Sequence, residues 1–277
     1  MDINNIISSI SVLSEKIFKS IEGEVYDLLD NIILIGPNLL KDEPLNKIFF
    51  PKGINGIIVV ANSLIIFYTT YYILTRIISM YNGNTVESVY KFIIKLVIIV
   101  LLVNNSYGIC NEVLNINEVL NNTIDKACVD IAKKEVSFKS LKEEITSIEQ
   151  LKKDSEISID TITKNMLSFM SISLLITFAI RYVTVILLAI LSPFAFVCLT
   201  SNITRGISKS IGKLFFLNLF FQMFIKLLLV IPIIYTDKTS IIYKVVLIGT
   251  MYMLYRANSF VREIASNISV PNVKGCG

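Results

Sequence analysis

The sequence predicts an all-α membrane protein with about five transmembrane helices and a helical extracytoplasmic loop. Of its 277 residues, 53% are hydrophobic and 17% are charged, whereas a soluble domain is usually about 45–50% apolar and about 25% charged. The apolar residues gather in long uncharged blocks, which are typical of segments that cross a bilayer. Because lipid offers the backbone no hydrogen-bond partners, each block is predicted to be a helix.

Five apolar blocks are the predicted spans. They cover residues 54–75, 92–105, 166–200, 214–236 and 241–255. About 20 residues are needed to cross the hydrocarbon core. The second and fifth blocks reach this length only if Lys95 and Lys244 extend their ammonium groups to the membrane interface. No Asp or Glu lies within any of the five blocks.

The distribution of Lys and Arg predicts the orientation, because cytoplasmic loops of membrane proteins are enriched in these residues. Five spans place nine bases and two acids on one side of the membrane, and fifteen bases and twenty acids on the other. We therefore expect a multi-pass cell-membrane protein with its N-terminus outside and its C-terminus in the cytoplasm. The predicted parts are an extracytoplasmic amphipathic segment (1–52), spans one and two (53–106), the extracytoplasmic loop (107–165), spans three to five (166–256) and a cytoplasmic tail (257–277).

The predicted cytoplasmic loop 201–213 contains Arg205, Lys209 and Lys213 and no acid. These cations are candidates for contact with a cytoplasmic partner or with anionic lipid headgroups, and lipid is the simpler interpretation for any one of them. The excess of Lys and Arg over Asp and Glu in this chain is therefore explained by its orientation in the membrane, and it gives little support to nucleic-acid binding.

The extracytoplasmic loop contains two apolar patterns with helical spacing. The first comprises Val113, Leu120, Ile124, Ala127 and Ile131, and the second comprises Phe138, Leu141, Ile145 and Ile148. We expect two amphipathic helices that pack on each other or on a partner. A solvated helical hairpin and a binding surface are equally supported interpretations of this loop.

Cys110 and Cys128 both lie in this loop, on the side of the membrane where a disulfide persists. In one continuous helix their Cα atoms would lie ~27 Å apart, at 1.5 Å per residue, whereas a disulfide requires Cα atoms within about 7 Å. The candidate disulfide therefore requires a turn between the two cysteines, near residues 115–117.

Besides Lys95 and Lys244 near the starts of their blocks, two charged residues fall within the predicted spans, Arg181 and Lys226. A charge in the hydrocarbon core is costly, so it usually faces a partner or water. Both side chains are therefore candidates for an intramembrane polar path or for helix packing. For Arg181 the favoured alternative is a guanidinium that extends to the outer interface. For Lys226 the two interpretations are equally supported.

The residue types present argue against an enzyme. The chain has no His, which removes the usual general base and the commonest metal ligand. Its four cysteines lack the spacing of a metal site. It has no phosphate-binding Gly-x-x-x-x-Gly-Lys-Ser/Thr motif, so energy for any transport must come from a partner. We expect no catalytic, cofactor-binding or metal-binding residues, and no cofactor.

Parts of the last third of the chain resemble the TrbL-type conjugal transfer membrane proteins, which are polytopic subunits of type IV secretion systems. The residues that carry the resemblance are Arg181-Tyr182-Val183, Ser192-Pro193-Phe194-Ala195-Phe196, Leu214-Phe215-Phe216, Phe221-Gln222-Met223 and the tail 259–265. The layout of this family, with an outside N-terminus, about five spans and a cytoplasmic tail, agrees with the orientation derived from the charges.

The resemblance implies a membrane channel or scaffold subunit of a conjugative secretion apparatus, which helps DNA or protein cross the cytoplasmic membrane. It implies other secretion-system membrane subunits and ATPases as partners, assembly into a homo-oligomer, contact with membrane lipid and transferred DNA in passage. The main alternative is a small-solute permease subunit, which would group polar residues near the bilayer midplane. A membrane-anchored assembly factor without a conduit also agrees with the sequence.

Overall fold

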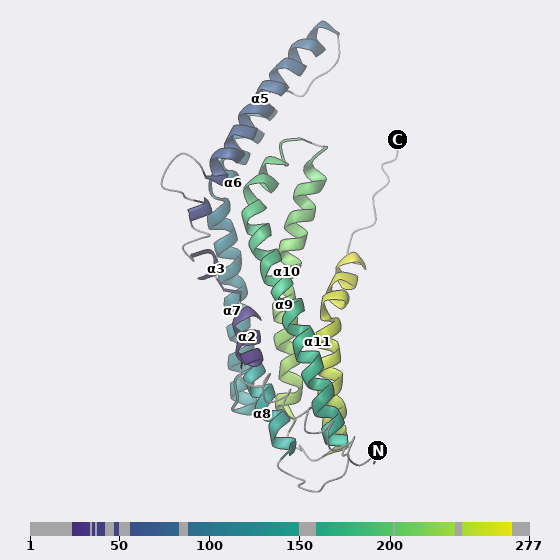
Figure 1. Cartoon of the computed structure of the whole chain (residues 1–277). Coiled ribbons are helices and arrows are strands. Elements are labelled where there is room, and N and C mark those ends of the chain that lie inside the picture. Colours follow the sequence, from purple (N-terminus) through teal and green to yellow (C-terminus); the bar gives the residue numbers. More distant parts are fainter. Residues whose placement is uncertain are drawn as a thin grey trace. The chain divides into compact units, whose positions relative to one another are not determined.

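A computed structural model describes residues 24–33, 35–36, 38–41, 47–49, 56–82, 88–149, 159–201, 203–235 and 240–267. Every regular element in these ranges is a helix, which confirms the all-α prediction (Figure 1). The predicted amphipathic helix over residues 3–21 lies outside the described ranges.

The helices follow the apolar blocks closely. Their bounds are α2 Glu24–Ile33, α3 Asn38–Lys41, α5 Ile57–Tyr81, α6 Val89–Asn104, α7 Ser106–Ala132, α8 Phe138–Glu149, α9 Ile159–Val197, α10 Arg205–Ile234 and α11 Ile241–Asn267. The five predicted spans lie in α5, α6, α9, α10 and α11. The two helices predicted in the extracytoplasmic loop are α7 and α8. Polar flanking residues extend α9 and α10 beyond their apolar blocks.

Three helical segments are long and apolar enough to cross a membrane, namely α5, α10 and residues 170–197 of α9. Helices α6 and α7 meet this criterion only as a pair, bent by 62° at their junction, so they form at most one further span. The chain is therefore a multi-pass membrane protein. Its described part has three or four candidate spans, fewer than the five predicted.

The compositions of α6 and α11 explain the smaller number of spans. Helix α6 has 16 residues, which is ~24 Å of helix at 1.5 Å per residue and less than the ~30 Å hydrocarbon core. Helix α11 carries Lys244 and Arg256 at the two ends of its uncharged run 245–255. Snorkelling of Lys95 and Lys244 was the condition on which the prediction of five spans depended.

The described residues of the chain fall into two compact units. Unit 1 comprises residues 1–35, 117–182 and 219–277, and unit 2 comprises residues 36–116 and 183–218. In unit 2, Ala61 and Ile65 of α5 form a buried core with Ile99 and Val103 of α6. Residues 194–199, at the C-terminal end of α9, include side chains that pack against this core.

Polar and aromatic contacts also join α5 to its neighbours in unit 2. Asn62 Nδ2 donates a hydrogen bond of 3.1 Å to Asn104 Oδ1 of α6. The rings of Tyr72 and Phe92 stack with centroids 3.6 Å apart. Tyr68 donates a hydrogen bond of 2.8 Å to the carbonyl oxygen of Thr200, which follows α9. The α5–α6 hairpin is therefore held by specific contacts on one side, while most of its apolar side chains are exposed.

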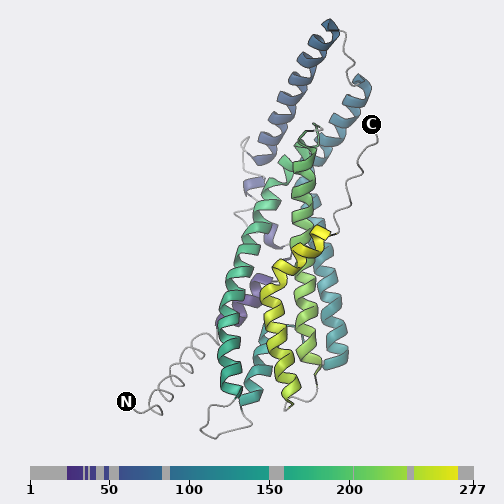
Figure 2. The same ribbon diagram turned by 90° about the vertical axis from the view of Figure 1, so that its right-hand side faces the viewer.

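In unit 1, α11 packs through a narrow seam and runs beside α9 and α10 (Figure 2). The seam residues recur at alternating four- and three-residue steps, which is the spacing of coiled-coil packing. They are Tyr243, Leu247, Thr250, Leu254 and Ala257, each at most 5% exposed, and Met251, which follows Thr250, is equally buried. Aromatic rings join three other helices of this unit, because Phe178 of α9 makes edge-on contacts with Phe138 of α8 and with Phe221 of α10.

The candidate disulfide is wrong. Helix α7 is continuous from Ser106 to Ala132 and therefore contains no turn between Cys110 and Cys128. Both cysteines are buried free thiols. The condition required by the sequence argument, a reversal near residues 115–117, is not met.

Candidate functional site

Helix α7 turns a polar face towards the interior of unit 1. Asn117 and Asn121 are 5% and 1% exposed, whereas Leu120 and Ile131, which were predicted to form the packing face, are 48% and 68% exposed. The prediction of a helix is confirmed, but the predicted face is wrong. Apolar spacing identifies the buried face only when water covers the opposite one, and lipid covers apolar side chains equally well.

Three residues of α7 form a polar stripe. Asn117, Asn121 and Asp125 follow one another at four-residue steps, so they lie on one side of the helix. Asn117 Nδ2 donates to Gln222 Oε1 of α10 at 3.0 Å, and Asn121 Nδ2 donates to the carbonyl oxygen of Asn117 at 2.7 Å. We call these residues, together with Gln222 and Lys226 of α10, which they contact, and Arg181 of α9, which contacts Gln222, the buried polar ladder. Its members are Asn117, Asn121, Asp125, Arg181, Gln222 and Lys226.

Arg181 of α9 faces the ladder. It is 5% exposed, and its Nη2 donates to Gln222 Oε1 at 3.3 Å. Its guanidinium carbon lies 5.1 Å from the centroid of the Phe221 ring, a cation–π distance. The favoured interpretation for Arg181 required a guanidinium that reaches the outer interface, and the enclosed position differs from it. The other interpretation, a side chain turned into the bundle, describes the geometry.

Lys226 of α10 is paired with a carboxylate. It is 3% exposed, and its ammonium group contacts Asp125 Oδ2 of α7 as a hydrogen-bonded ion pair. The second oxygen, Asp125 Oδ1, is buried and accepts no hydrogen bond from the described residues. Sequence analysis missed Asp125 because it searched the apolar blocks for a partner, whereas the acid lies in the polar segment assigned to the loop. The four-residue spacing of Asn117, Asn121 and Asp125 was the signal that could have found it.

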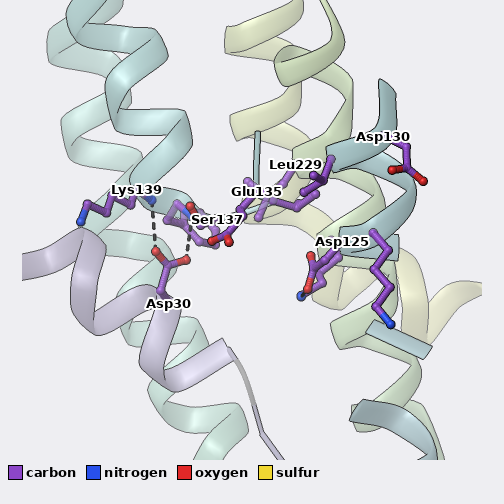
Figure 3. A pocket seen from close by; sticks show the side chains of 12 residues that line it. Asp30, Asp125, Asp130, Glu135, Ser137, Lys139 and Leu229 are labelled. Carbon is purple, nitrogen blue, oxygen red and sulfur yellow. Dashed lines mark hydrogen bonds and ion pairs between the residues drawn. The ribbon is translucent and has the colours of Figure 1, made fainter. Parts of the chain in front are cut away.

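A cavity of about 550 Å³ adjoins this ion pair. Its lining residues come from α2, α7, α8 and α10 and from the segment that joins α7 to α8 (Figure 3). They are Asp30, Asp125, Lys126, Val129, Asp130, Glu135, Val136, Ser137, Phe138, Lys139, Lys226 and Leu229. Four carboxyl groups and three ammonium groups nearly balance, so formal charge alone gives the cavity little preference for an anion or a cation. Within the described residues, no group of three or more His, Cys, Asp or Glu side chains is placed to hold a metal ion.

One wall of the cavity is the N-terminus of α8. The backbone N–H groups of its first residues, which have no partner within the helix, donate hydrogen bonds to side chains. Ser137 Oγ accepts from Ser140 N at 2.9 Å, which is a local helix cap. Asp30 of α2 accepts from Phe138 N at 2.7 Å and from Lys139 N at 3.1 Å (Figure 3). Burial raises the pKa of the Asp30 carboxyl above its ordinary value of 3.8, and the two backbone hydrogen bonds partly oppose that rise. Helix α2 therefore caps α8 from a distance of more than a hundred residues in sequence.

Arg205, Lys209 and Lys213 lie on α10, not in a loop, because the helix begins at Arg205. All three are exposed, and their four-residue spacing places them on one side of the helix. Cations at a helix N-terminus are unfavourable with respect to the helix dipole, and the first turn contains no acid. Helix stability therefore does not account for the position of Arg205, and the three exposed cations agree with an external anionic surface.

No protein-family profile, curated protein or solved structure matches the chain. The resemblance to the TrbL-type proteins therefore depends on the quoted residues alone.

Removing one partner of the Asp125–Lys226 pair should destabilise the bundle more than removing both. We expect Asp125→Asn alone to cost about 3–5 kcal/mol, because it leaves the enclosed Lys226 ammonium group without its partner, and the double variant to cost less than Asp125→Asn. Lys226→Met alone should cost less than Asp125→Asn, because the Asp125 side chain is 28% exposed at the wall of the cavity. Unfolding of the detergent-solubilised protein measures this. Lys209→Met, the same change at an exposed position of the same helix, should alter stability by less than about 0.5 kcal/mol. Additive losses in the double variant would contradict the pairing.

Asp30 should make stability depend on pH in an unusual direction. Because its pKa is raised in the folded state, protonation favours folding: this contribution is complete below about pH 3.8 and disappears as the pH rises through the folded pKa. Relative to Asp30→Asn, the wild-type protein should therefore gain stability on acidification through this window. Ser137→Ala, which removes the neighbouring cap without removing a charge, should cost about 1 kcal/mol at every pH. A difference between wild type and Asp30→Asn that is constant with pH would contradict this assignment.

Proposed function

We propose that the chain is a channel or scaffold subunit of a conjugative type IV secretion apparatus in the cell membrane. The observation that carries the proposal is a contact between two of the segments that resemble the TrbL-type proteins. Arg181, from the first, lies over Phe221 and donates to Gln222, both from the second. Residues that resemble the family in sequence are thus used together in packing. The membrane subunits and ATPases of such an apparatus are the proposed partners.

The proposed orientation has the N-terminus outside and the C-terminus in the cytoplasm, with the cations of α10 at the cytoplasmic face near anionic headgroups. The chain then crosses outward once between α5 and α9, which assigns the bent pair α6–α7 to one broken span. A cytoplasmic C-terminus also requires α11 to cross. Its short uncharged run supports this only if Lys244 and Arg256 reach the two interfaces, while the seam that packs beside α9 and α10 holds the helix in the bundle.

Reporter fusions test this orientation. We expect a periplasmic-type phosphatase to be inactive, and a green fluorescent protein to be fluorescent, when fused after Gly277. The opposite results are expected after Ala132, where the broken span has reached the outer side. An active phosphatase after Gly277 would indicate that α11 does not cross the membrane.

A permease subunit is a second candidate, because the buried polar ladder supplies the grouped polar residues that this function needs. In this alternative Arg181, Gln222 and Lys226 would contact a small polar solute. In the secretion subunit the same residues hold three helices together. The two functions differ in what is lost when the protein is removed.

Deletion of the chain separates the two candidates. For a secretion subunit, we expect conjugative DNA transfer to fall to the level of a donor that lacks the secretion ATPase, with solute uptake unchanged. Wild-type protein should restore transfer, and Lys226→Met should restore it poorly. Lys209→Met should restore transfer as well as the wild-type protein does, if the cations of α10 contact lipid individually and weakly. Unchanged transfer together with a loss of uptake would favour the permease.

A further inference from the structure

The α5–α6 hairpin carries its charges at one end, where α5 ends and α6 begins (Figure 2). Arg76 lies in the last two turns of α5, and Lys91 and Lys95 lie in the first two turns of α6. Between residues 54 and 111 the sequence has a single acid, Glu87, which lies in the connection outside the described residues. We call Arg76, Lys91 and Lys95 the basic hairpin end; it combines three cations from two helices with one nearby acid in sequence.

Aromatic contacts bring the cations of the two helices to the same end of the hairpin. The ring of Tyr72 in α5 stacks on the ring of Phe92 in α6, with centroids 3.6 Å apart. One turn further along α5, Arg76 Nη1 donates to Tyr72 Oη at 3.4 Å. In α6, Lys91 directly precedes Phe92 and is exposed, and Lys95 follows one turn later and is half-buried. The stacked rings therefore hold cations of both helices in one cluster.

The length of α5 places this cluster at a membrane interface. Residues 57–75 of α5 contain no charge and form ~28 Å of helix at 1.5 Å per residue, which is close to the ~30 Å hydrocarbon core. Because α5 is a candidate span, Arg76 lies where the helix leaves the hydrocarbon. The tyrosines around it are exposed, as is typical of side chains at headgroup level. They are Tyr71, Tyr81 and Tyr90, at 59%, 88% and 74%.

A lipid fits this end of the hairpin better than a soluble anion does. Exposed apolar side chains lie between the cations in sequence, among them Ile73, Ile77 and Ile94 at 52%, 49% and 43%. The phosphate groups of a nucleic acid would meet the cations, but they would leave these apolar side chains in water. We propose that the basic hairpin end binds an anionic phospholipid, with the headgroup phosphate at the cations and the acyl chains against the exposed apolar side chains of α5 and α6.

The proposed lipid site differs from the three cations of α10. Arg205, Lys209 and Lys213 lie along one side of a single helix, whereas the basic hairpin end combines two helices, a stacked ring pair and apolar side chains. The site requires only that α5 crosses the membrane. It is therefore independent of the cargo of the chain and of its orientation.

Native mass spectrometry of the detergent-solubilised full-length chain tests the lipid site. We expect the wild-type protein to bind phosphatidylglycerol more tightly than phosphatidylcholine, whose headgroup has no net charge. Lys91→Gln should weaken phosphatidylglycerol binding about fivefold, and Lys91→Gln combined with Lys95→Gln about 25-fold, because one Lys or Arg near an anionic membrane surface contributes about that factor. Phosphatidylcholine binding should not change.

Two variants control for charge and position. Lys91→Arg keeps the charge and should keep the lipid preference. Lys41→Gln removes the same charge from an exposed position at the other end of the hairpin, because the neighbouring Leu40 carbonyl oxygen accepts a hydrogen bond from Tyr107 at the start of α7. The length of α6, ~24 Å, exceeds the Debye length, so Lys41→Gln should change phosphatidylglycerol binding by less than about twofold.

A measurement on the wild-type protein needs no substitution. Phosphatidylglycerol added to the detergent-solubilised protein should raise its melting temperature more than phosphatidylcholine does, because a ligand that binds the folded state stabilises it. Equal effects of the two lipids would refute the site, as would equal losses of binding in Lys41→Gln and Lys91→Gln. Displacement of phosphatidylglycerol by short duplex DNA, with weaker DNA binding in the same Gln variants, would assign the cations to nucleic acid instead.

The lipid site and the secretion function can fail separately. A preference for phosphatidylglycerol, with DNA transfer unaffected by deletion of the chain, would leave the site intact and refute the secretion function. Loss of transfer on deletion, without any lipid preference, would leave the secretion function intact and refute the site.

Discussion

The ion pair between Asp125 and Lys226 is the constraint on which the arrangement of unit 1 depends. A lysine in the middle of an apolar helix must have a partner, and the partner is an acid in a segment whose composition resembles an extramembranous loop. The pair fixes which face of α7 is buried and brings its Asn residues within reach of Gln222. Gln222 in turn receives Arg181, so two cations and one anion are held on a scaffold of neutral amides. A buried pair of this kind adds specificity of packing more than net stability.

The sequence was sufficient to predict the helices but not to predict which side of a helix is buried. Uncharged blocks and helical periodicity predicted each helix from α5 to α11, because these features depend on local composition. The buried side of α7 was predicted wrongly, since Leu120 and Ile131 fulfil the rule for soluble helices while Asn117 and Asn121 are the residues enclosed. Asp125 was missed because it lies in the polar segment assigned to the loop, although its four-residue spacing from Asn121 places it on the buried side of α7. The cap that Asp30 gives to α8 joins residues 108 positions apart and was inaccessible to sequence analysis.

Two features of the fold lie where helical segments end. The N-terminus of α8 is capped by Ser137 from its own chain segment and by Asp30 from α2, so the position of α2 contributes to the stability of α8. The N-terminus of α10 differs: Arg205 lies in its first turn, where the helix dipole disfavours a cation, and the exposed Lys209 and Lys213 follow on the same side of the helix. The N–H groups at the start of α8 are hydrogen-bonded within the protein, whereas the cations at the start of α10 are exposed to its surroundings.

Helix α7 carries a second series of polar residues, Glu118, Asn122, Lys126 and Asp130, which begins one position after Asn117 of the buried polar ladder. Deletion of one residue between Asn117 and Asp125 would rotate everything beyond it by about 100° and would present Lys126 to Lys226 in place of Asp125. The number of residues in this stretch is therefore constrained as strictly as their identity. Insertions and deletions are expected to be tolerated in the connections on either side of α7 but not within the helix.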